Sequence, residues 1–220
     1  MIKRKLVFLG AGGFGREVAW QVSQIQSLTA AYEVLGFVDD SPEPAGNEIN
    51  GLPVLGDTQW LLSYPEELSV VICIGNSRIR KQVYERLSTN PRLSYPTIIA
   101  DNVRYSDTVT FGQGCIICLS SILTVNVQLG DFVIINLDCT IGHDVEMDNF
   151  VTLYPSVNVS GNVHIGECAE LGTGCQIIQK KTVGRSTIIG AGSVVVKDLP
   201  ADCTAVGAPA LPIKFHPPGK

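Results

Sequence analysis

The sequence has few of the features that mark membrane or nucleic-acid-binding proteins. No stretch approaches the roughly 18 consecutive apolar residues of a membrane helix, so we expect no membrane insertion. The 220 residues carry 17% charged residues and a net charge of −5. This balance argues against nucleic acid as a partner, because binding it needs a basic face. Residues 3–5 are basic, as at the start of a signal peptide, but the apolar run after them ends at Gly10 without a cleavage site, and we expect a first strand there.

The sequence also lacks a disulfide or zinc framework. It has seven cysteines, an odd number, and their spacing matches neither kind of site. Cys115, Cys139 and Cys175 fall in a column of small residues described below, where a reduced thiol packs as a small hydrophobic side chain. We therefore expect reduced core cysteines in a cytoplasmic protein, with a reactive thiol as the alternative.

What the sequence does contain is a six-residue repeat. Every sixth position from Ile99 to Val195 is apolar, through 17 consecutive hexads. A small or β-branched residue lies four positions after most of them, and Lys181 is an exception at which we expect a local distortion. A period of six fits neither the helical repeat nor the alternation of an isolated strand. It predicts short strands joined by tight corners, in stacked parallel coils that cover one another's core.

Glycine follows the large residue of the repeat at seven corners, where we expect it to adopt backbone angles closed to other residues. These positions are Gly112, Gly130, Gly142, Gly166, Gly172, Gly184 and Gly190. The repeat resembles that of the hexapeptide-repeat acyltransferases, which implies a left-handed parallel β-helix of three hexads per turn. The handedness rests on the resemblance alone, because parallel crossovers are otherwise almost always right-handed.

The first 96 residues have a different pattern, in which strands alternate with helices. We expect strands at 5–9, 34–38 and 70–74, and helices at 16–25, 58–62 and 79–87. This alternation predicts a small parallel sheet, a Rossmann-like half domain of the α/β class. The expected organisation is therefore an α/β domain over residues 1–96, followed by a β-helix domain over residues 97–220.

A glycine-rich loop, Gly10-Ala-Gly-Gly-Phe-Gly15, lies between the first expected strand and helix. Its pattern is that of a dinucleotide-binding loop, and Asp39 follows 24 positions after Gly15. No second mononucleotide half follows, which favours a nucleotide-sugar over a dinucleotide, and a purely structural tight turn is the third interpretation. Backbone N–H groups at the start of a helix favour an anionic ligand.

The whole layout resembles the sugar acyltransferases of the sialic acid O-acetyltransferase family and the N-acetyltransferases of bacterial nucleotide-linked amino-sugar pathways. The resemblance is carried by Gly10–Gly15, Asp39-Asp40, Ile74–Ser77, the hexads, Asn136–Asp144 and Val206–Ala210. It implies that the nucleotide-sugar is bound by Gly12, Gly13, Phe14, Asp39, Asp40 and Gly75. Many relatives have histidine where Phe14 stands, and a phenyl ring can stack on a base or sugar but cannot hydrogen-bond to it.

Only three histidines are present, and His143 is the candidate general base. Imidazole suits proton transfer near neutral pH, and the adjacent Asp144 can fix the ring and favour its protonated form. The resemblance implies that His143 is the base, that Asp144 raises its basicity and that Asn136 lies close to it. Gly161, one coil further on, should leave room over the ring. The alternative is an exposed histidine beside an exposed aspartate.

The other two histidines, His164 and His216, are expected to be surface residues. The resemblance implies acetyl-CoA as acyl donor, held between neighbouring subunits of a homotrimer. The expected contacts with the donor are Thr152, Thr173 and Ala191, while Lys180 and Lys181 either meet its phosphates or stay solvated.

The expected activity is therefore transfer of an acetyl group from acetyl-CoA to a sugar, first of all to the amine of a nucleotide-linked 4-amino-sugar. Alternatives are O-acetylation of sialic acid or another small acceptor, a non-catalytic nucleotide-sugar-binding protein and an NAD-linked oxidoreductase. A metal-dependent lyase of the γ-carbonic anhydrase type needs three histidine ligands, and the repeats contain only His143 and His164. We expect no metal.

Overall fold

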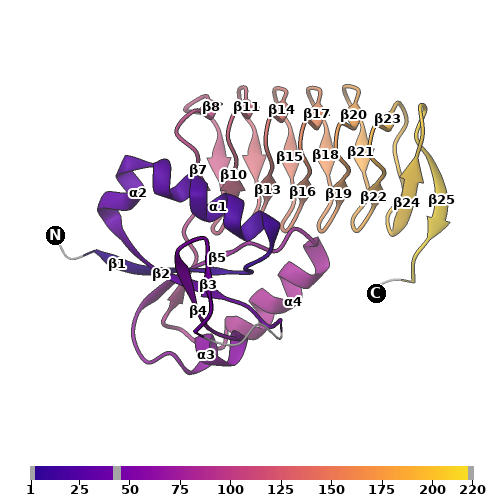
Figure 1. Cartoon of the computed structure of the whole chain (residues 1–220). Coiled ribbons are helices and arrows are strands. Elements are labelled where there is room, and N and C mark those ends of the chain that lie inside the picture. The colour runs from indigo at the N-terminus through magenta and orange to yellow at the C-terminus, as the bar shows by residue number, and fades with distance from the viewer. Residues whose placement is uncertain (1–2, 42–45, 218–220) are drawn as a thin grey trace. The chain divides into compact units, whose positions relative to one another are not determined.

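The computed structural model describes residues 3–41 and 46–217, which form two compact units (Figure 1). The first unit comprises the chain up to Gly75 together with residues 79–98, and the second comprises residues 76–78 and the chain from Ile99 onward. Across the described residues, no helix combines the length and apolar character needed to cross a membrane.

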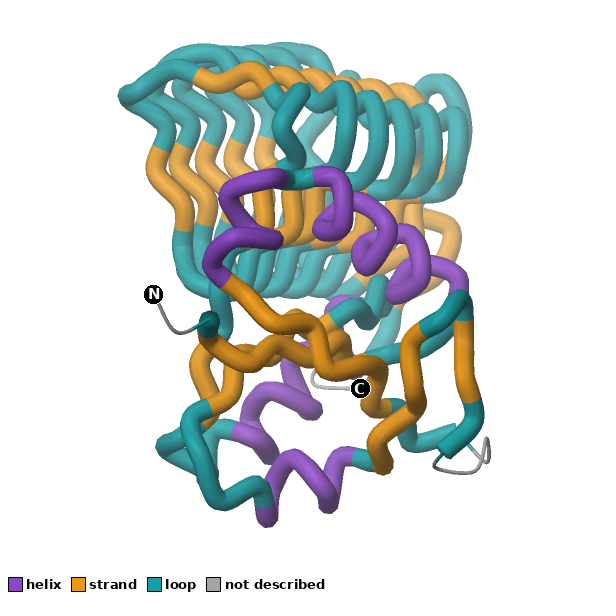
Figure 2. The backbone as a smooth tube through the Cα atoms, turned by 60° about the vertical axis from the view of Figure 1, so that its left-hand side comes forward, coloured by secondary structure: helices purple, strands orange, loops and turns teal. Residues whose placement is uncertain are grey.

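The first unit is a largely parallel six-stranded sheet with helices on both faces. The strand order is β3-β4-β2-β1-β5-β6, and only β3 runs antiparallel to its neighbour. Helices α1 and α2 lie on one face, and α3 and α4 on the other (Figures 1 and 2). The elements are β1 Arg4–Leu9, α1 Gly13–Gln24, α2 Gln26–Ala31, β2 Tyr32–Val38, β3 Glu48–Ile49, β4 Leu52–Gly56, α3 Thr58–Ser63, β5 Leu68–Ile72, α4 Ser77–Leu87 and β6 Leu93–Ser94.

The three expected strands and three expected helices of this unit are all present. Helix α1 buries Val18 and Val22, and Ile25 is buried at its end, as the helical spacing of these residues predicts. Helix α2 was not predicted from the sequence, because it buries none of its residues and so carries no apolar periodicity. Strand β5 ends at Ile72, two residues earlier than expected.

The second unit is a parallel β-helix whose 17 two-residue strands, β7 to β23, match the 17 hexads one for one. Strands from successive coils align in three faces (Figure 2). The eight-stranded face holds β7 Ile98–Ile99, β10 Ile116–Ile117, β13 Ile134–Ile135, β16 Thr152–Leu153, β19 Glu170–Leu171 and β22 Ile188–Ile189, and then β24 Cys203–Val206 and β25 Leu211–Phe215, which pair antiparallel. The six-stranded face holds β8 Arg104–Tyr105, β11 Ile122–Leu123, β14 Thr140–Ile141, β17 Asn158–Val159, β20 Gln176–Ile177 and β23 Val194–Val195. The five-stranded face holds β9 Thr110–Phe111, β12 Gln128–Leu129, β15 Glu146–Met147, β18 His164–Ile165 and β21 Thr182–Val183.

Both columns of the repeat point into the prism. The large residues from Ile117 onward are buried, and so are the small ones, which together form one continuous core. Tyr105 is exposed because it belongs to the first coil, which has no coil before it. The expected distortion at Lys181 is absent: β21 pairs with β18 in register, and Lys180 has the same φ near +58° as its stacked neighbours.

The corner glycines have a different role from the expected one. None of the seven has a positive φ; the left-handed residues lie two positions later and are mostly not glycine. A Cβ on Gly142 would lie 2.6 Å from the backbone nitrogen of Gly161, and one on Gly172 would lie 2.6 Å from that of Ala191. Glycine is therefore needed because the next coil passes too close for a side chain.

All seven cysteines lie in the described part of the chain, are buried and form no disulfide, as expected for reduced core residues. Burial raises the pKa of the Cys139 thiol to about 11 and that of Cys175 to about 12. Because the thiolate is the reactive form, these two side chains are poorly suited to nucleophilic chemistry.

Candidate functional site

The glycine-rich loop lies at the carboxyl edge of the first unit's sheet, where β1, β2 and β5 end side by side. Gly10 donates its N–H to the carbonyl of Val38 at 2.8 Å, and Cys73 donates to that of Leu9 at 2.8 Å. The connection through α1 leads to β2 on one side of β1, whereas β5 lies on the other side. The order of the strands therefore reverses at β1. Open α/β sheets bind ligands beside the carboxyl ends of the strands at such a reversal.

The four loop glycines fall into two classes. Gly10 has a φ of +105°, and a Cβ on Gly15 would run into the carbonyl oxygen of Gly10, so the fold requires both. A Cβ on Gly12 would meet nothing within 4 Å, and one on Gly13 would meet only the end of the Arg16 side chain at 4.0 Å. The fold itself therefore does not require glycine at positions 12 and 13, which leaves open backbone beside the half-buried Phe14.

The two aspartates after β2 already have partners in the sheet edge. Asp39 accepts the N–H of Ala11 at 2.6 Å and that of Ser41 at 2.7 Å. Burial disfavours the ionised form of Asp39, but these two N–H groups outweigh it and lower the pKa of the carboxyl. Asp40 accepts from the backbone N–H and the hydroxyl of Thr58 at 2.7 and 3.0 Å. Both aspartates therefore hold the edge in shape, and Asp39 fixes the glycine loop directly.

Arg80 also belongs to this edge, although no sequence pattern indicated it. Its side chain is buried and donates to the carbonyls of Ile74 and Gly75 at 2.6 and 3.0 Å. It therefore fixes the turn after β5 that contains the predicted ligand residue Gly75. An arginine on a polar helix gives no sequence signal for burial, because only the fold reveals the two carbonyls that it meets.

His143 lies in the β-helix, on the corner that follows strands of the six-stranded face. Nδ1 of His143 is 2.8 Å from Oδ2 of Asp144, and the two side chains are 57% and 47% exposed. The pair is therefore accessible to a substrate, and the carboxylate is placed to hold the ring as expected. The pKa of Asp144 is lowered, first by a hydrogen bond from Asn126 and then by the one from His143, so the group stays a carboxylate in mildly acidic solution.

Gly161 lies beneath the ring of His143 on the next coil. A Cβ at this position would lie 2.5 Å from both Cε1 and Nε2 of His143. No real Cβ approaches that closely, so the ring can occupy this place only above a glycine. The neighbouring Asn162 donates its backbone N–H to the carbonyl of His143 at 2.8 Å.

The other predicted residues do not gather around His143 within one chain. Asn136 lies at the opposite end of the six-stranded face, where its Oδ1 accepts the N–H of Leu137 at 2.7 Å. Thr173 and Ala191 are exposed on the same corner as Asn136, in successive positions of later coils. Thr152, by contrast, is buried on the eight-stranded face.

His164 and His216 both have partners that the sequence did not reveal. Nε2 of His164 lies 3.2 Å from Oδ1 of Asp148, a residue 16 positions earlier that the coils bring alongside. His216 contacts the hydroxyl of Thr204 at 2.8 Å. The described residues bring no three histidine, cysteine or acidic side chains together in a way that could hold a metal ion.

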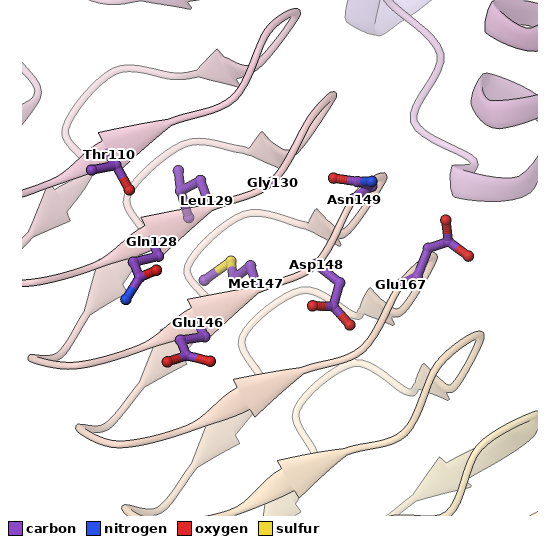
Figure 3. A pocket seen from close by; sticks show the side chains of 9 residues that line it. All are labelled: Thr110, Gln128, Leu129, Gly130, Glu146, Met147, Asp148, Asn149 and Glu167. Atoms are coloured by element: carbon purple, nitrogen blue, oxygen red, sulfur yellow. The ribbon is translucent and has the colours of Figure 1, made fainter.

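A hollow of about 490 Å³ lies on the five-stranded face and the corner after it (Figure 3). Three of its lining side chains are carboxylates, namely Glu146, Asp148 and Glu167, and His143 is not among the lining residues. Figure 3 shows Glu146 and Asp148 on one coil and Glu167 on the next. Such a lining repels phosphate groups, so this hollow is not a candidate site for CoA or a sugar nucleotide.

Both units of the chain are similar to known acetyltransferases. Residues 5–87 match the family model described as the PglD N-terminal domain. The chain is 34% identical to the acetyltransferase domain of PglB from Neisseria gonorrhoeae, solved in complex with acetyl coenzyme A, with a TM-score of 0.86 over 96% of this chain and 100% of that one. The fold and these matches thus define an acetyltransferase of the hexapeptide-repeat superfamily, with a left-handed β-helix.

The particular family follows from two further relatives. The chain is 31% identical to GDP-perosamine N-acetyltransferase of Escherichia coli O157:H7, over 94% of this chain and 96% of that protein. PerB from Caulobacter crescentus, solved with CoA and GDP-perosamine, is 29% identical with a TM-score of 0.86, and covers 96% of this chain and 97% of its own. Variants of that enzyme with one histidine replaced by Asn or Ala are also known with both ligands. The chain belongs to this family of nucleotide-amino-sugar N-acetyltransferases.

Proposed function

We propose that this protein transfers the acetyl group of acetyl-CoA to the amine of a nucleotide-linked 4-amino-sugar. The observation that carries the proposal is the exposed pair of His143 and Asp144, held above Gly161 in a β-helix of the acetyltransferase type. O-acetylation and binding without turnover are the alternatives that the assay below separates from it.

In the proposed step, the sugar amine attacks the thioester carbonyl and a C–N bond forms. Nε2 of His143 removes a proton from the amine nitrogen, the C–S bond breaks, and the CoA sulfur leaves and ends as a thiol after taking up a proton. Asp144 accepts the N–H on Nδ1, which leaves the lone pair on Nε2 and stabilises the imidazolium once it forms. A base is needed because the nitrogen becomes positively charged as the C–N bond forms, and loss of its proton keeps the amine from leaving again.

The two domains, residues 1–96 and 97–220, divide the substrates between them in this proposal. The open backbone at Gly12 and Gly13, the start of α1, and the turn at Gly75 suit the phosphates and sugar of the nucleotide. Phe14 offers a face on which a base or sugar can stack. Asp39 and Asp40 contribute mainly by shaping this edge, because their carboxylates already accept backbone N–H groups.

The acetyl-CoA contacts are proposed at Thr173 and Ala191, which are exposed on one corner of the later coils. Thr152 is a weaker candidate because it is buried. Asn136 shares the corner of Thr173 and lies one side of the prism away from His143. A site that contains both Asn136 and His143 therefore needs a second copy of the chain, which supports a homotrimer with sites between subunits. The reduced cysteines suit a cytoplasmic enzyme.

The test is release of free CoA from acetyl-CoA in the presence of UDP-, dTDP- and GDP-linked 4-amino-sugars. Each amino-sugar is paired with its 4-hydroxy counterpart, and mass spectrometry of the product locates the acetyl group. We expect thiol release with at least one amine and acetylation of its nitrogen. Equal turnover of the hydroxy counterparts would favour an O-acetyltransferase, and tight binding of a sugar nucleotide without thiol release would favour a binding protein.

A further inference from the structure

The corner that carries His143 contains a column of stacked amide and carboxylate side chains. Asn126, Asp144 and Asn162 follow one another at intervals of 18 residues, and their φ values are +57°, +56° and +57°. Asn and Asp tolerate this left-handed conformation better than most residues. The stacking brings the side chain of each residue alongside the corresponding one on the next coil.

Asn126 and His143 contact opposite oxygens of the same carboxylate. The side-chain amide of Asn126 donates to Oδ1 of Asp144 at 3.0 Å, while Oδ2 of Asp144 lies 2.8 Å from Nδ1 of His143. Asn126 is itself anchored, because its backbone N–H donates to the hydroxyl of Thr108 at 2.9 Å. The carboxylate is therefore held at both ends, which fixes the oxygen that it turns toward the imidazole.

Nδ1 of His143 has a second neighbour, the amide nitrogen of Asn162 at 3.4 Å. The two contacts require opposite tautomers, because Asp144 needs a hydrogen on Nδ1 and the Asn162 amide needs a lone pair there. The contact with Asp144 is shorter and charge-assisted, whereas 3.4 Å exceeds the ordinary range for an N–H donor. The proton therefore lies on Nδ1, and the lone pair of the neutral ring lies on Nε2.

We propose that Asn126 is a positioning residue for acetyl transfer: it aligns the carboxylate of Asp144 and thereby keeps His143 in the tautomer with its proton on Nδ1. The proposal rests on the proposed role of His143 as the base. Turn geometry alone does not explain Asn126, because Ser120 fills the left-handed position of the neighbouring corner, with φ +66°, and its hydroxyl accepts from Asn102 instead of holding a carboxylate.

The test replaces Asn126 by glycine, which accepts a φ of +57° without strain and keeps the backbone N–H that Thr108 accepts. Ser186→Gly is the matched control, since it removes a side chain from the same kind of turn, with φ +53°, on the corner that carries neither His143 nor Thr173. NMR of the full-length protein with isotope-labelled histidine reports which ring nitrogen of His143 carries the proton, and steady-state kinetics reports kcat and KM separately.

We expect the proton of His143 on Nδ1 in the unmodified protein, and a mixture of tautomers in Asn126→Gly. We also expect kcat of Asn126→Gly to fall roughly three- to tenfold, the scale of one lost hydrogen bond, with KM for both substrates unchanged. Ser186→Gly should leave the tautomer and kcat as they are. An unchanged tautomer in Asn126→Gly would overturn the proposal, whatever happens to kcat.

The same measurements separate this proposal from the proposed function. If His143→Ala retains full activity, His143 is not the base and the assignment of Asn126 to the reaction falls with it. If His143→Ala is inactive but Asn126→Gly keeps both kcat and the Nδ1 proton, the base assignment stands and the positioning role of Asn126 is wrong.

Discussion

His143 and His164 offer a comparison between two histidines of one β-helix. Both imidazoles are about half exposed, at 57% and 42%, and each contacts an aspartate, at 2.8 and 3.2 Å. Only His143 lies on the corner above Gly161, so only its replacement should affect catalysis. Positioned general bases contribute roughly 10²–10⁴ in rate, and we expect His143→Ala to lower kcat by about that factor. His164→Ala should leave kcat within about twofold of the unmodified enzyme.

The pH dependence of kcat/KM provides a second readout of the same pair. The profile should have an acidic limb, because protonation of Nε2 removes the base, and His143→Ala should keep only the part of it that comes from protonation of the substrate amine. Asp144 stays ionised through that limb because its pKa is lowered by Asn126 and His143. Both alanine variants should melt near the temperature of the unmodified protein, since the replaced side chains are outside the core. An acidic limb that is unchanged in His143→Ala would point to another base.

Gly161 carries a prediction of its own. A Cβ there would lie 2.5 Å from Nε2 of His143, so Gly161→Ala should displace the ring from the place in which Asp144 holds it. We expect a loss of kcat approaching that of His143→Ala and little change in the melting temperature, because the exposed ring can swing outward. The variant His143→Ala/Gly161→Ala should be no slower than His143→Ala alone. A further tenfold loss in the double variant would contradict this explanation.

At the scale of elements, the loop before α1 contains one glycine that the fold requires, Gly15, and one that we propose for ligand binding, Gly13. Gly15→Ala should destabilise the fold, by about 1–3 kcal/mol on the scale of overpacking, because its Cβ would collide with the carbonyl of Gly10. Gly13→Val should fold normally, since its surroundings are open. It should weaken binding of the sugar nucleotide while acetyl-CoA binding stays intact. Calorimetry with both ligands tests this, and equal losses for the two would contradict the division between the domains.

The elements that could be predicted from the sequence are those whose signal is periodic. The hexads predicted each strand of the β-helix because one residue in six must fill the prism. What escaped prediction depends on contacts that no periodic pattern indicates. Asp148 lies 16 positions before His164, and Arg80 reaches back to the carbonyls of Ile74 and Gly75 in the turn before α4. The pairing of His143 with Asp144 could be predicted because the two residues are adjacent in the chain.

At the scale of the whole molecule, the six-stranded face and the corner after it carry exposed apolar side chains. Ile122, Val125, Ile178 and Val196 are 43%, 48%, 41% and 36% exposed. These side chains lie near the His143 corner, at one end of the strands of this face. The Thr173 corner lies at the other end of the strands. Apolar surface of this kind favours burial against a partner. Threefold symmetry can set the Thr173 corner of one copy against the His143 corner of the next.

We therefore predict a homotrimer that is required for activity. Ile178→Glu should place a charge in the interface, shift light scattering toward the monomer mass and abolish acetyl transfer without unfolding the β-helix. Gln128→Glu is the matched control, because it adds the same charge to the exposed five-stranded face, and it should remain trimeric and active. The two variants are best compared at micromolar concentration by light scattering together with the CoA-release assay. A fully active monomer, or dissociation by Gln128→Glu but not by Ile178→Glu, would show that the six-stranded face is not the interface.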